Sequence, residues 1–381
     1  MEEALSDPNE DPTPDLARLY RRWAQGGAAL LITGHVIVDR AARARPRDVV
    51  VEDERALPML EAWATAARSG GAEVWMQLNH AGRQTPRHVA REPVAPSAVP
   101  AVKMFASFGR PRALREEEIE DIIARFGRAA AIAERAAFTG VQIHAAHGYL
   151  LSQFLSPLTN RREDQWGGSI ENRARVLLRV VRAVRASVKS TTAVAVKLNS
   201  ADFQRGGFDK EDFAAVVRML DSEGIDLLEI SGGNYESPVL FAGTRTASRE
   251  AYFLEFARAV RDLTSVPIML TGGFRSRKVM EDALSEGVVD VIGMARPLAI
   301  DPDFPRRLLD GTVERSEAPM KAVFLKSFNA LADGAWSWMQ IRRMAHGAAP
   351  DPALSTWLSI FYYLFFDLFM SRTRMMRLGS G

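Results

Sequence analysis

The sequence predicts an α/β fold of the TIM (β/α)8 barrel class, and three observations carry that prediction. Short apolar runs alternate with helical periods along most of the chain. The runs are continuously apolar, as in parallel strands that are buried on both faces. Polar stretches follow most of the runs, and no glycine fingerprint follows the first one. A barrel, whose site lies at the carboxyl ends of its strands, is therefore favoured over a doubly wound sheet.

Seven strands are expected, at residues 28–32, 74–78, 141–143, 193–198, 227–230, 266–270 and 289–294. Helices are expected between them, at residues 14–25, 54–69, 116–137, from Ser169 onward, 212–223, 253–263 and 279–286. The helix at 116–137 shows the pattern most clearly, because its apolar residues form one stripe: Ile119, Ile122, Ile123, Phe126 and Ala130. Residues 84–112 are rich in proline and basic residues, and are expected to cross one face as a long excursion.

A closed barrel of this class needs eight strands, and the strand that is missing should be the first. No apolar run precedes the helix at residues 14–25. We therefore expect the first strand to be absent from this chain, and a true start upstream of Met1 is the explanation that we hypothesise.

The chain is expected to divide into a barrel at residues 1–315 and a helical extension at residues 316–381. Residues 354–370, LSTWLSIFYYLFFDLFM, are the most apolar stretch, and Arg372, Arg374 and Arg377 follow them. This length is at the lower limit for a membrane span, and Asp367 places a charge inside it. We expect a helix that packs on the barrel or on a partner subunit of a homo-oligomer. A membrane-surface helix with a basic flank is a less favoured alternative.

Composition excludes several classes of function. The formal net charge is +2, from 49 basic and 47 acidic residues, so bulk charge gives no argument for a nucleic-acid partner. The chain has no cysteine, which excludes disulfides, thiolate zinc sites, cysteine nucleophiles and cysteine-held iron–sulfur clusters. The first residues, MEEALSDPNEDP, are acidic and polar rather than a secretory signal. A cytoplasmic protein is expected.

Side chains that can carry chemistry gather at the expected strand ends. Five of the six histidines (His35, His80, His88, His144 and His147) fall in these ends or in the loops after them. The other candidates at the ends are Gln77, Asn79, Arg83, Tyr149, Lys197, Asn199, Gly272, Gly273 and Arg296. Since the carboxyl ends of the strands form the functional face of such a barrel, we expect one site there.

Two neighbouring strand ends carry a phosphate-binding pattern. Gly272 and Gly273 follow one strand, and Ala295 and Arg296 follow the last one. Glycines let backbone N–H groups approach a phosphate, and an arginine adds a bidentate cation. The alternative is that the glycines only serve tight turns.

His144 and His147 stand three residues apart at the end of the strand at 141–143. They could bind a metal, although no carboxylate lies within HAAHGYL, or they could be satisfied inside the core. As a pair they could instead donate hydrogen bonds to one carbonyl oxygen and stabilise an enolate, with Tyr149 as proton donor. Such a reduction needs a hydride carrier, and the phosphate pattern suggests flavin mononucleotide (FMN).

Several motifs resemble one family. HAAHGYLLSQFLSPLTNRREDQWGGSIENR closely resembles the signature of the Old Yellow Enzyme family of flavin-dependent ene-reductases. MQLNHAGR, SGG, TGGF and GMARPLAIDP match the same family in the same order, over roughly residues 11–311. The resemblance implies FMN as cofactor, NADH or NADPH as reductant and an α,β-unsaturated carbonyl, an enone or enal, as substrate. In the implied cycle, flavin N5 takes a hydride from the nicotinamide and passes it to the substrate β-carbon.

The resemblance also implies roles for individual residues. Gln77 would hydrogen-bond the flavin pyrimidine ring, and Lys197 would face flavin N1 and O2. Gly272, Gly273, Ala295 and Arg296 would hold the phosphate. The substrate would be met by four residues, of which Tyr149 protonates the α-carbon and the others bind: His144, His147 and Arg83. No metal site is expected.

Two departures from the family leave alternatives open. The family's first strand, with its flavin-contacting Pro-x-Ser/Thr/Cys segment, is absent, so a non-catalytic or impaired flavin-binding paralogue is one alternative. A flavin-dependent amine dehydrogenase is another, but the relatives of that type carry a cysteine-held cluster and this chain has no cysteine. A phosphosugar isomerase or lyase barrel, which would be colourless, is a third.

Overall fold

The protein folds around one curled parallel sheet. The computed structural model describes residues 3–101, 108–233, 250–319, 321, 323 and 329–366. The sheet has the strand order β1-β3-β6-β7-β8-β9-β10, and β2 also pairs with β3. Its strands are β1 (Leu30–Ile32), β2 (Val36–Ile37), β3 (Glu73–Asn79), β6 (Gly140–Ala145), β7 (Ala193–Asn199), β8 (Leu227–Ser231), β9 (Ile268–Thr271) and β10 (Val291–Gly293). All seven expected strands are present, and the predicted α/β barrel class is confirmed.

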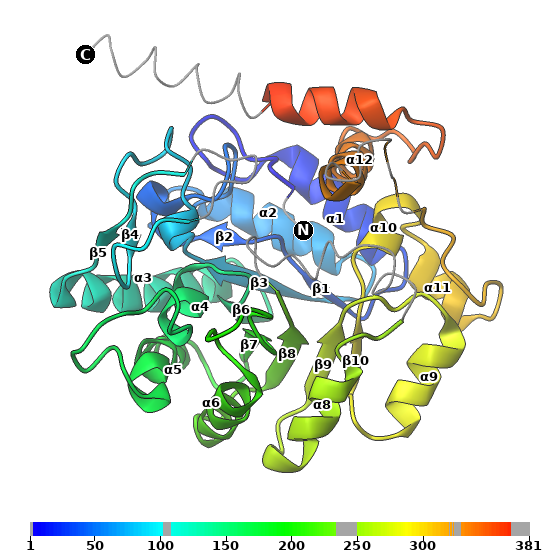
Figure 1. Cartoon of the computed structure of the whole chain (residues 1–381). Coiled ribbons are helices and arrows are strands. Elements are labelled where there is room, and N and C mark those ends of the chain that lie inside the picture. Colours follow the sequence, from blue (N-terminus) through cyan, green and yellow to red (C-terminus); the bar gives the residue numbers. More distant parts are fainter. Residues whose placement is uncertain are drawn as a thin grey trace, which may run out of the picture.

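Helices cover the outside of the sheet (Figure 1). They are α1 (Pro14–Ala24), α2 (Leu57–Arg68), α3 (Glu116–Arg135), α4 (Leu150–Leu155), α5 (Ile170–Ser187), α6 (Lys210–Ser222), α8 (Leu254–Val260), α9 (Arg277–Ser285), α10 (Arg296–Ile300), α11 (Phe304–Leu309) and α12 (Asn329–Ala345). Local sequence sets their starts: Ser169 caps α5 and Asp209 caps α6, each by accepting a backbone N–H of the first turn. The expected start of a helix at Ser169 is thereby confirmed.

Three short helices, α4, α10 and α11, are not expected from the sequence pattern, and α4 lies nearest the histidine pair. The structure places the short helix α4 at residues 150–155, ahead of the long polar loop, with every residue buried. The reason is tertiary: Leu150, Leu151 and Phe154 enter the core. The Gln153 amide also donates to the carbonyl oxygens of Gly148 and Ala81, at 2.7 and 3.1 Å. The excursion at 84–112 carries a small two-stranded sheet of β4 (Val94–Ala95) and β5 (Arg112–Ala113), and its residues 102–107 lie outside the described part.

The strand ring is open between β10 and β1. Within the ranges that the structure describes, no strand pairs with both of them. The outer helices nevertheless meet across this seam: Trp23 of α1 donates its indole N–H to the Leu298 carbonyl of α10 at 3.0 Å. The Arg306 amide of α11 also donates to the Gly26 carbonyl at 2.9 Å. Helices therefore close the wall between β10 and β1, where a closed barrel would have one more strand.

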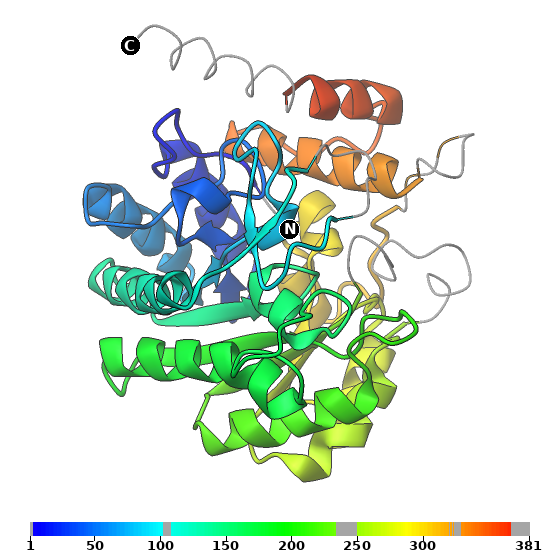
Figure 2. The same ribbon diagram turned by 60° about the vertical axis from the view of Figure 1, so that its left-hand side comes forward.

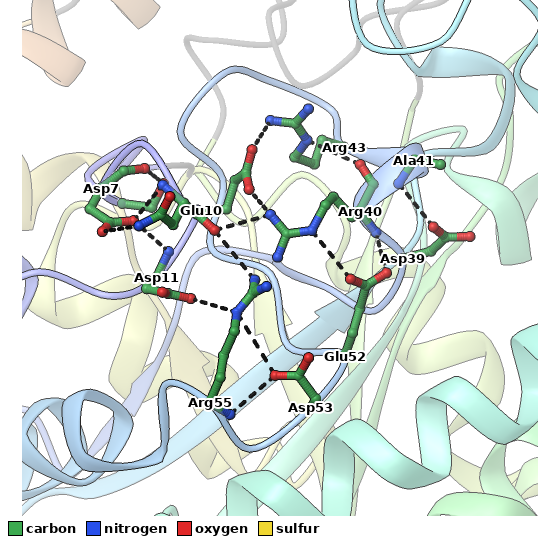
Figure 3. A network of polar contacts seen from close by, with 12 residues as sticks. Asp7, Glu10, Asp11, Asp39, Arg40, Ala41, Arg43, Glu52, Asp53 and Arg55 are labelled. Carbon is green, nitrogen blue, oxygen red and sulfur yellow. Dashed lines mark hydrogen bonds and ion pairs between the residues drawn. The ribbon is translucent and has the colours of Figure 1, made fainter. Parts of the chain in front are cut away.

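The N-terminal segment and α12 lie over this seam (Figure 1). The Glu3 carboxylate accepts the Gly34 amide after β1 at 3.0 Å, and its carbonyl accepts the Trp338 indole N–H of α12 at 3.1 Å. Farther along, buried Glu10 pairs with Arg40 and Arg43 (Figure 3). These contacts fix the start of the described chain against the loop that follows β2.

Beyond α12, residues 356–366 form a further helix above it, the last one drawn as a ribbon in Figure 2. Its inner face packs on α12, where Tyr363 contacts Trp338 edge-on at 5.4 Å between ring centroids. Its outer face is apolar and exposed: Trp357, Leu358, Phe361, Tyr362, Leu364 and Phe365. Within the described residues, no helix combines the length and the apolar character that a bilayer span requires. Residues 367–370 of the predicted apolar segment lie outside the described part.

Candidate active site

Two histidines and a tyrosine meet where β6 ends. His144 is the fifth residue of β6, and its ring centroid lies 5.0 Å from that of His147 and 5.0 Å from that of Tyr149. His147 has a positive φ of 61°, so the chain turns sharply there and carries Tyr149 back beside His144. Tyr149 then precedes the first residue of α4. The predicted catalytic residues are thus brought together.

Both imidazoles are neutral at neutral pH. Burial lowers the pKa of His144 well below its usual value, and the neighbouring His147 and Lys197 lower it further. Desolvation and Lys197 lower the pKa of His147 in the same way. The His144 Nδ1 accepts the Ala146 amide N–H at 3.2 Å, so the proton of the neutral ring resides on Nε2. His144 can therefore donate one hydrogen bond to a carbonyl oxygen.

His147 is held from the two neighbouring strands. Its backbone N–H donates to Asn199 Oδ1 at the end of β7, at 3.1 Å, and its Nε2 lies 2.9 Å from Ser231 Oγ at the end of β8. Since β6, β7 and β8 are adjacent in the sheet, three strand ends converge on this ring. A substrate carbonyl that took the His147 Nε2–H would replace the serine.

A polar chain fills the barrel interior beneath these rings. Gln77 Nε2 donates to Gln142 Oε1 at 2.7 Å, and Gln142 Nε2 donates to Glu229 Oε2 at 2.7 Å. Glu229 Oε1 in turn accepts from Lys197 Nζ at 2.6 Å. Burial raises the pKa of Glu229, but Lys197 and the hydrogen bonds outweigh burial and lower that pKa below its usual value. The predicted flavin contacts Gln77 and Lys197 are thereby connected.

The predicted phosphate residues gather around Tyr252. Gly272, with φ of 150°, lies so close to Tyr252 and Phe253 that a Cβ would come within 3.0 and 2.8 Å of their rings. Burial raises the pKa of Tyr252, and nearby Arg296 partly offsets the effect. The Arg296 side chain is 37% exposed and pairs with Asp333 of α12 at 3.4 Å. Gly273, with φ of 81°, follows Gly272, and Ala295 immediately precedes α10.

This donor set fits FMN. Gln77 and Lys197 offer an amide and a cation for the polar edge of a flavin ring, as predicted. Arg296 supplies a partly exposed cation beside glycine backbone, which suits a phosphate. Among the described residues, no group of three metal-ligating side chains is present.

Arg83 takes part in a different set of contacts. Its Nη1 donates to the Pro100 carbonyl at 2.9 Å, and its amide N–H donates to Gln153 Oε1 at 3.2 Å. Its neighbour Gln84 donates to the His147 carbonyl at 3.1 Å. Arg83 therefore lies beside the loop that carries His147 and holds the excursion, and its role in substrate binding stays a prediction.

Sequence reasoning missed Gln142, Glu229 and Ser231, although each joins the site. Gln142 and Glu229 lie inside strands rather than at their ends, so a search of strand ends passed over them. A polar residue in the middle of the apolar runs VQIHA and LLEIS was the available signal. Conversely His35 and His80 have structural partners, because their Nε2 atoms face Asp48 at 3.4 Å and Asp39 at 3.8 Å.

A parallel barrel with paired histidines, a polar interior and a candidate glycine–arginine phosphate site at its strand ends is an arrangement that suits a flavin-binding oxidoreductase. The family model described as NADH:flavin oxidoreductase / NADH oxidase family matches residues 3–314, and the chain belongs to that family, the Old Yellow Enzyme family. It is an NAD(P)H-dependent flavin oxidoreductase with FMN as cofactor.

Relatives support this assignment. The chain is 38% identical over 338 residues to NADH-dependent flavin oxidoreductase iliE of Hypocrea jecorina, covering 81% of this chain and 83% of that one. The old yellow enzyme homologue from Zymomonas mobilis superposes with a TM-score of 0.72 at 26% identity, covering 86% and 92% of the two chains. A 2-naphthoyl-CoA reductase has a TM-score of 0.79 at 26% identity; 89% of this chain is covered, but only 54% of that one.

Proposed function

We propose that the enzyme reduces the carbon–carbon double bond of an α,β-unsaturated carbonyl compound, an enone or enal. The observation that carries the proposal is the cluster of Tyr149 with two neutral imidazoles. Neutral donors suit an uncharged carbonyl oxygen. A metal site or an anion site would need ligands or cations that the cluster lacks.

The residues divide the work of such a reduction. His144, with its proton on Nε2, donates to the substrate carbonyl oxygen. His147, whose backbone is held by Asn199, adds a second donor from its ring. Hydrogen bonds to this oxygen stabilise the negative charge that develops there when the β-carbon is reduced. Tyr149 then gives its phenolic proton to the α-carbon. FMN, when bound, supplies the hydride that it has taken from NAD(P)H.

We also propose how the chain holds its cofactor. Gly272, Gly273, Ala295 and Arg296 are proposed to hold the FMN phosphate, and Gln77 and Lys197 its ring. The barrel is proposed to end near residue 315, with residues 316–381 as its helical extension.

Replacing Tyr149 by Phe tests the proton-donor role. Phenylalanine keeps the ring that packs against His144 and His35, at 5.0 and 5.4 Å between centroids, and removes only the hydroxyl. We expect reoxidation of the reduced enzyme by cyclohexenone to slow by about 100-fold or more, since a general acid contributes that much. Flavin reduction by nicotinamide should stay within a few-fold of wild type. Stopped-flow absorbance resolves the two half-reactions, and equal slowing of both would show that Tyr149 is not the proton donor.

A further inference from the structure

We propose that Glu229 is a positioning residue that sets both the charge and the hydrogen-bond polarity of the flavin ring site. The inference rests on the proposed function, in that Gln77 and Lys197 hold the ring. Glu229 belongs to β8, and its side chain is 3% exposed. Glu229 accepts a hydrogen bond from Lys197 directly, and it is connected to Gln77 through Gln142.

Charge is the first property that Glu229 sets. Its Oε1 lies 2.6 Å from Lys197 Nζ, and the lysine side chain is only 13% exposed. A cation desolvated to this degree would act strongly on a flavin, because the surrounding dielectric screens it weakly. The carboxylate cancels most of that charge. The pair therefore presents the ring with a nearly neutral dipole instead of a full positive charge.

Polarity is the second property. An ionised carboxylate only accepts hydrogen bonds, so the group that Gln142 turns toward Glu229 has to be its NH2. The Gln142 carbonyl oxygen then faces Gln77, which has to answer with its own NH2. This order leaves the Gln77 carbonyl oxygen for the cofactor. A side-chain amide can place either its oxygen or its NH2 toward a neighbour. The one anion thus fixes the orientation of two amides, first Gln142 and then Gln77.

Replacing Glu229 by Gln should change both properties in one direction. Lys197 loses its counter-charge, so reduced FMN, which carries more negative charge, binds more tightly. The new amide turns its oxygen to Lys197 and its NH2 to Gln142, which reverses Gln142 and Gln77. Gln77 then offers an N–H toward ring oxygens that carry more negative charge in reduced FMN than in oxidised FMN. Both changes raise the flavin midpoint potential. We expect the ratio of the dissociation constants of oxidised and reduced FMN to rise about tenfold, or about 30 mV for two electrons.

The experiment is a dye-equilibrated reductive titration of the FMN-loaded protein at pH 7. Glu10→Gln is the matched control, because it removes another buried, ion-paired carboxylate, in the segment ahead of α1 (Figure 3). It should lower stability without moving the potential. Glu229→Asp keeps the charge and should stay near the wild-type potential. The double variant Glu229→Gln, Lys197→Met restores the net charge and should return the potential toward wild type.

Each failure has a distinct meaning. If Glu229→Gln binds FMN and keeps the wild-type potential, or if Glu10→Gln shifts the potential equally, Glu229 has only a structural role. If Glu229→Gln does not fold, Glu229→Asp serves as the test instead, and a raised potential in that variant overturns the inference. If the wild-type protein binds FMN and the Gln77→Ala and Lys197→Met variants bind it equally tightly, the proposed ring site is wrong, and the inference is overturned with it. Loss of enone reduction alone leaves the potential measurement unaffected.

Discussion

At the scale of single residues, burial decides which groups near the strand ends carry charge. His144 and His147 lose their protons because their surroundings are desolvated and Lys197 is near. Glu229 keeps its charge in an equally buried place, because Lys197 and Gln142 compensate it. Two neutral donors above one neutralised ion pair give a site that suits uncharged substrates.

The lowered histidine pKa values predict how stability depends on pH. In the unfolded chain both rings titrate near 6.5, whereas in the folded protein they resist protonation. The unfolded state therefore binds more protons below about pH 6.5, and stability is lost as pH falls. Between pH 6.5 and 5.5 we expect a loss of about 1 kcal/mol for each ring. Urea unfolding of wild type and His144→Gln at both pH values checks this, and an equally steep loss in the variant would contradict it.

Gly272 predicts a second effect at this scale. In Gly272→Ala the new Cβ meets the Phe253 ring at 2.8 Å, and the φ of 150° is also unfavourable for alanine. The rings of Phe253 and Tyr252 have to move, and Tyr252 lies beside Arg296. We expect FMN binding, measured by flavin fluorescence quenching, to weaken by about tenfold.

Gly287→Ala is the matched control for this variant. Gly287 also has a positive φ, 69°, but no atom outside its own chain neighbours lies within 4 Å of the place that a Cβ would take. It should lose about 1 kcal/mol of stability and keep its FMN affinity. Equal loss of FMN affinity in the two variants would show that Gly272 acts through stability alone.

At the scale of elements, α12 and the N-terminal segment stabilise the seam between β10 and β1. Trp338 of α12 is buried and donates to the Glu3 carbonyl, while Arg342 lies over its ring at 4.9 Å from the centroid. From the same helix, Asp333 reaches Arg296 of the proposed phosphate site. Helix α12 of the C-terminal extension therefore packs on the barrel at its open edge.

Truncation of Trp338 tests that role. We expect Trp338→Ala to lower the free energy of unfolding by about 3–5 kcal/mol, since it removes a buried indole and its hydrogen bond. Trp357→Ala, on the exposed face of the next helix, should change it by less than about 0.5 kcal/mol. Chemical denaturation gives both values. Similar losses in the two variants would mean that burial at the seam contributes little.

Prediction from sequence was strongest for the elements that follow from apolar periodicity. The seven strands were found because each is a mainly apolar run. Their limits differ where a residue cannot join the ladder: β9 begins at Ile268 because Pro267 has no N–H to donate. The short helices α4, α10 and α11 and the two-residue β2 were missed, since each is too short to show a period in the sequence. The polar chain through Gln142 and Glu229 needed the strand register, which no single sequence supplies.

At the scale of the whole molecule, an open strand ring is completed by helices (Figure 1). The candidate site lies where the strands end. The C-terminal helix at 356–366 adds an exposed apolar face that the described residues leave uncovered. The inner face of this helix packs on α12 of the same extension, where Tyr363 contacts Trp338. Contact with a partner subunit remains a prediction.

The most direct test of enone reduction on this barrel is one absorbance experiment on the purified chain. We expect a yellow, FMN-containing protein that bleaches with NADH or NADPH under anaerobic conditions and regains its colour when cyclohexenone is added. Recovery with cyclohexenone would show that the open barrel both holds the flavin and passes its hydride to an enone. A protein that stays colourless after incubation with FMN, or that bleaches and then responds to oxygen but not to cyclohexenone, would contradict the proposed function.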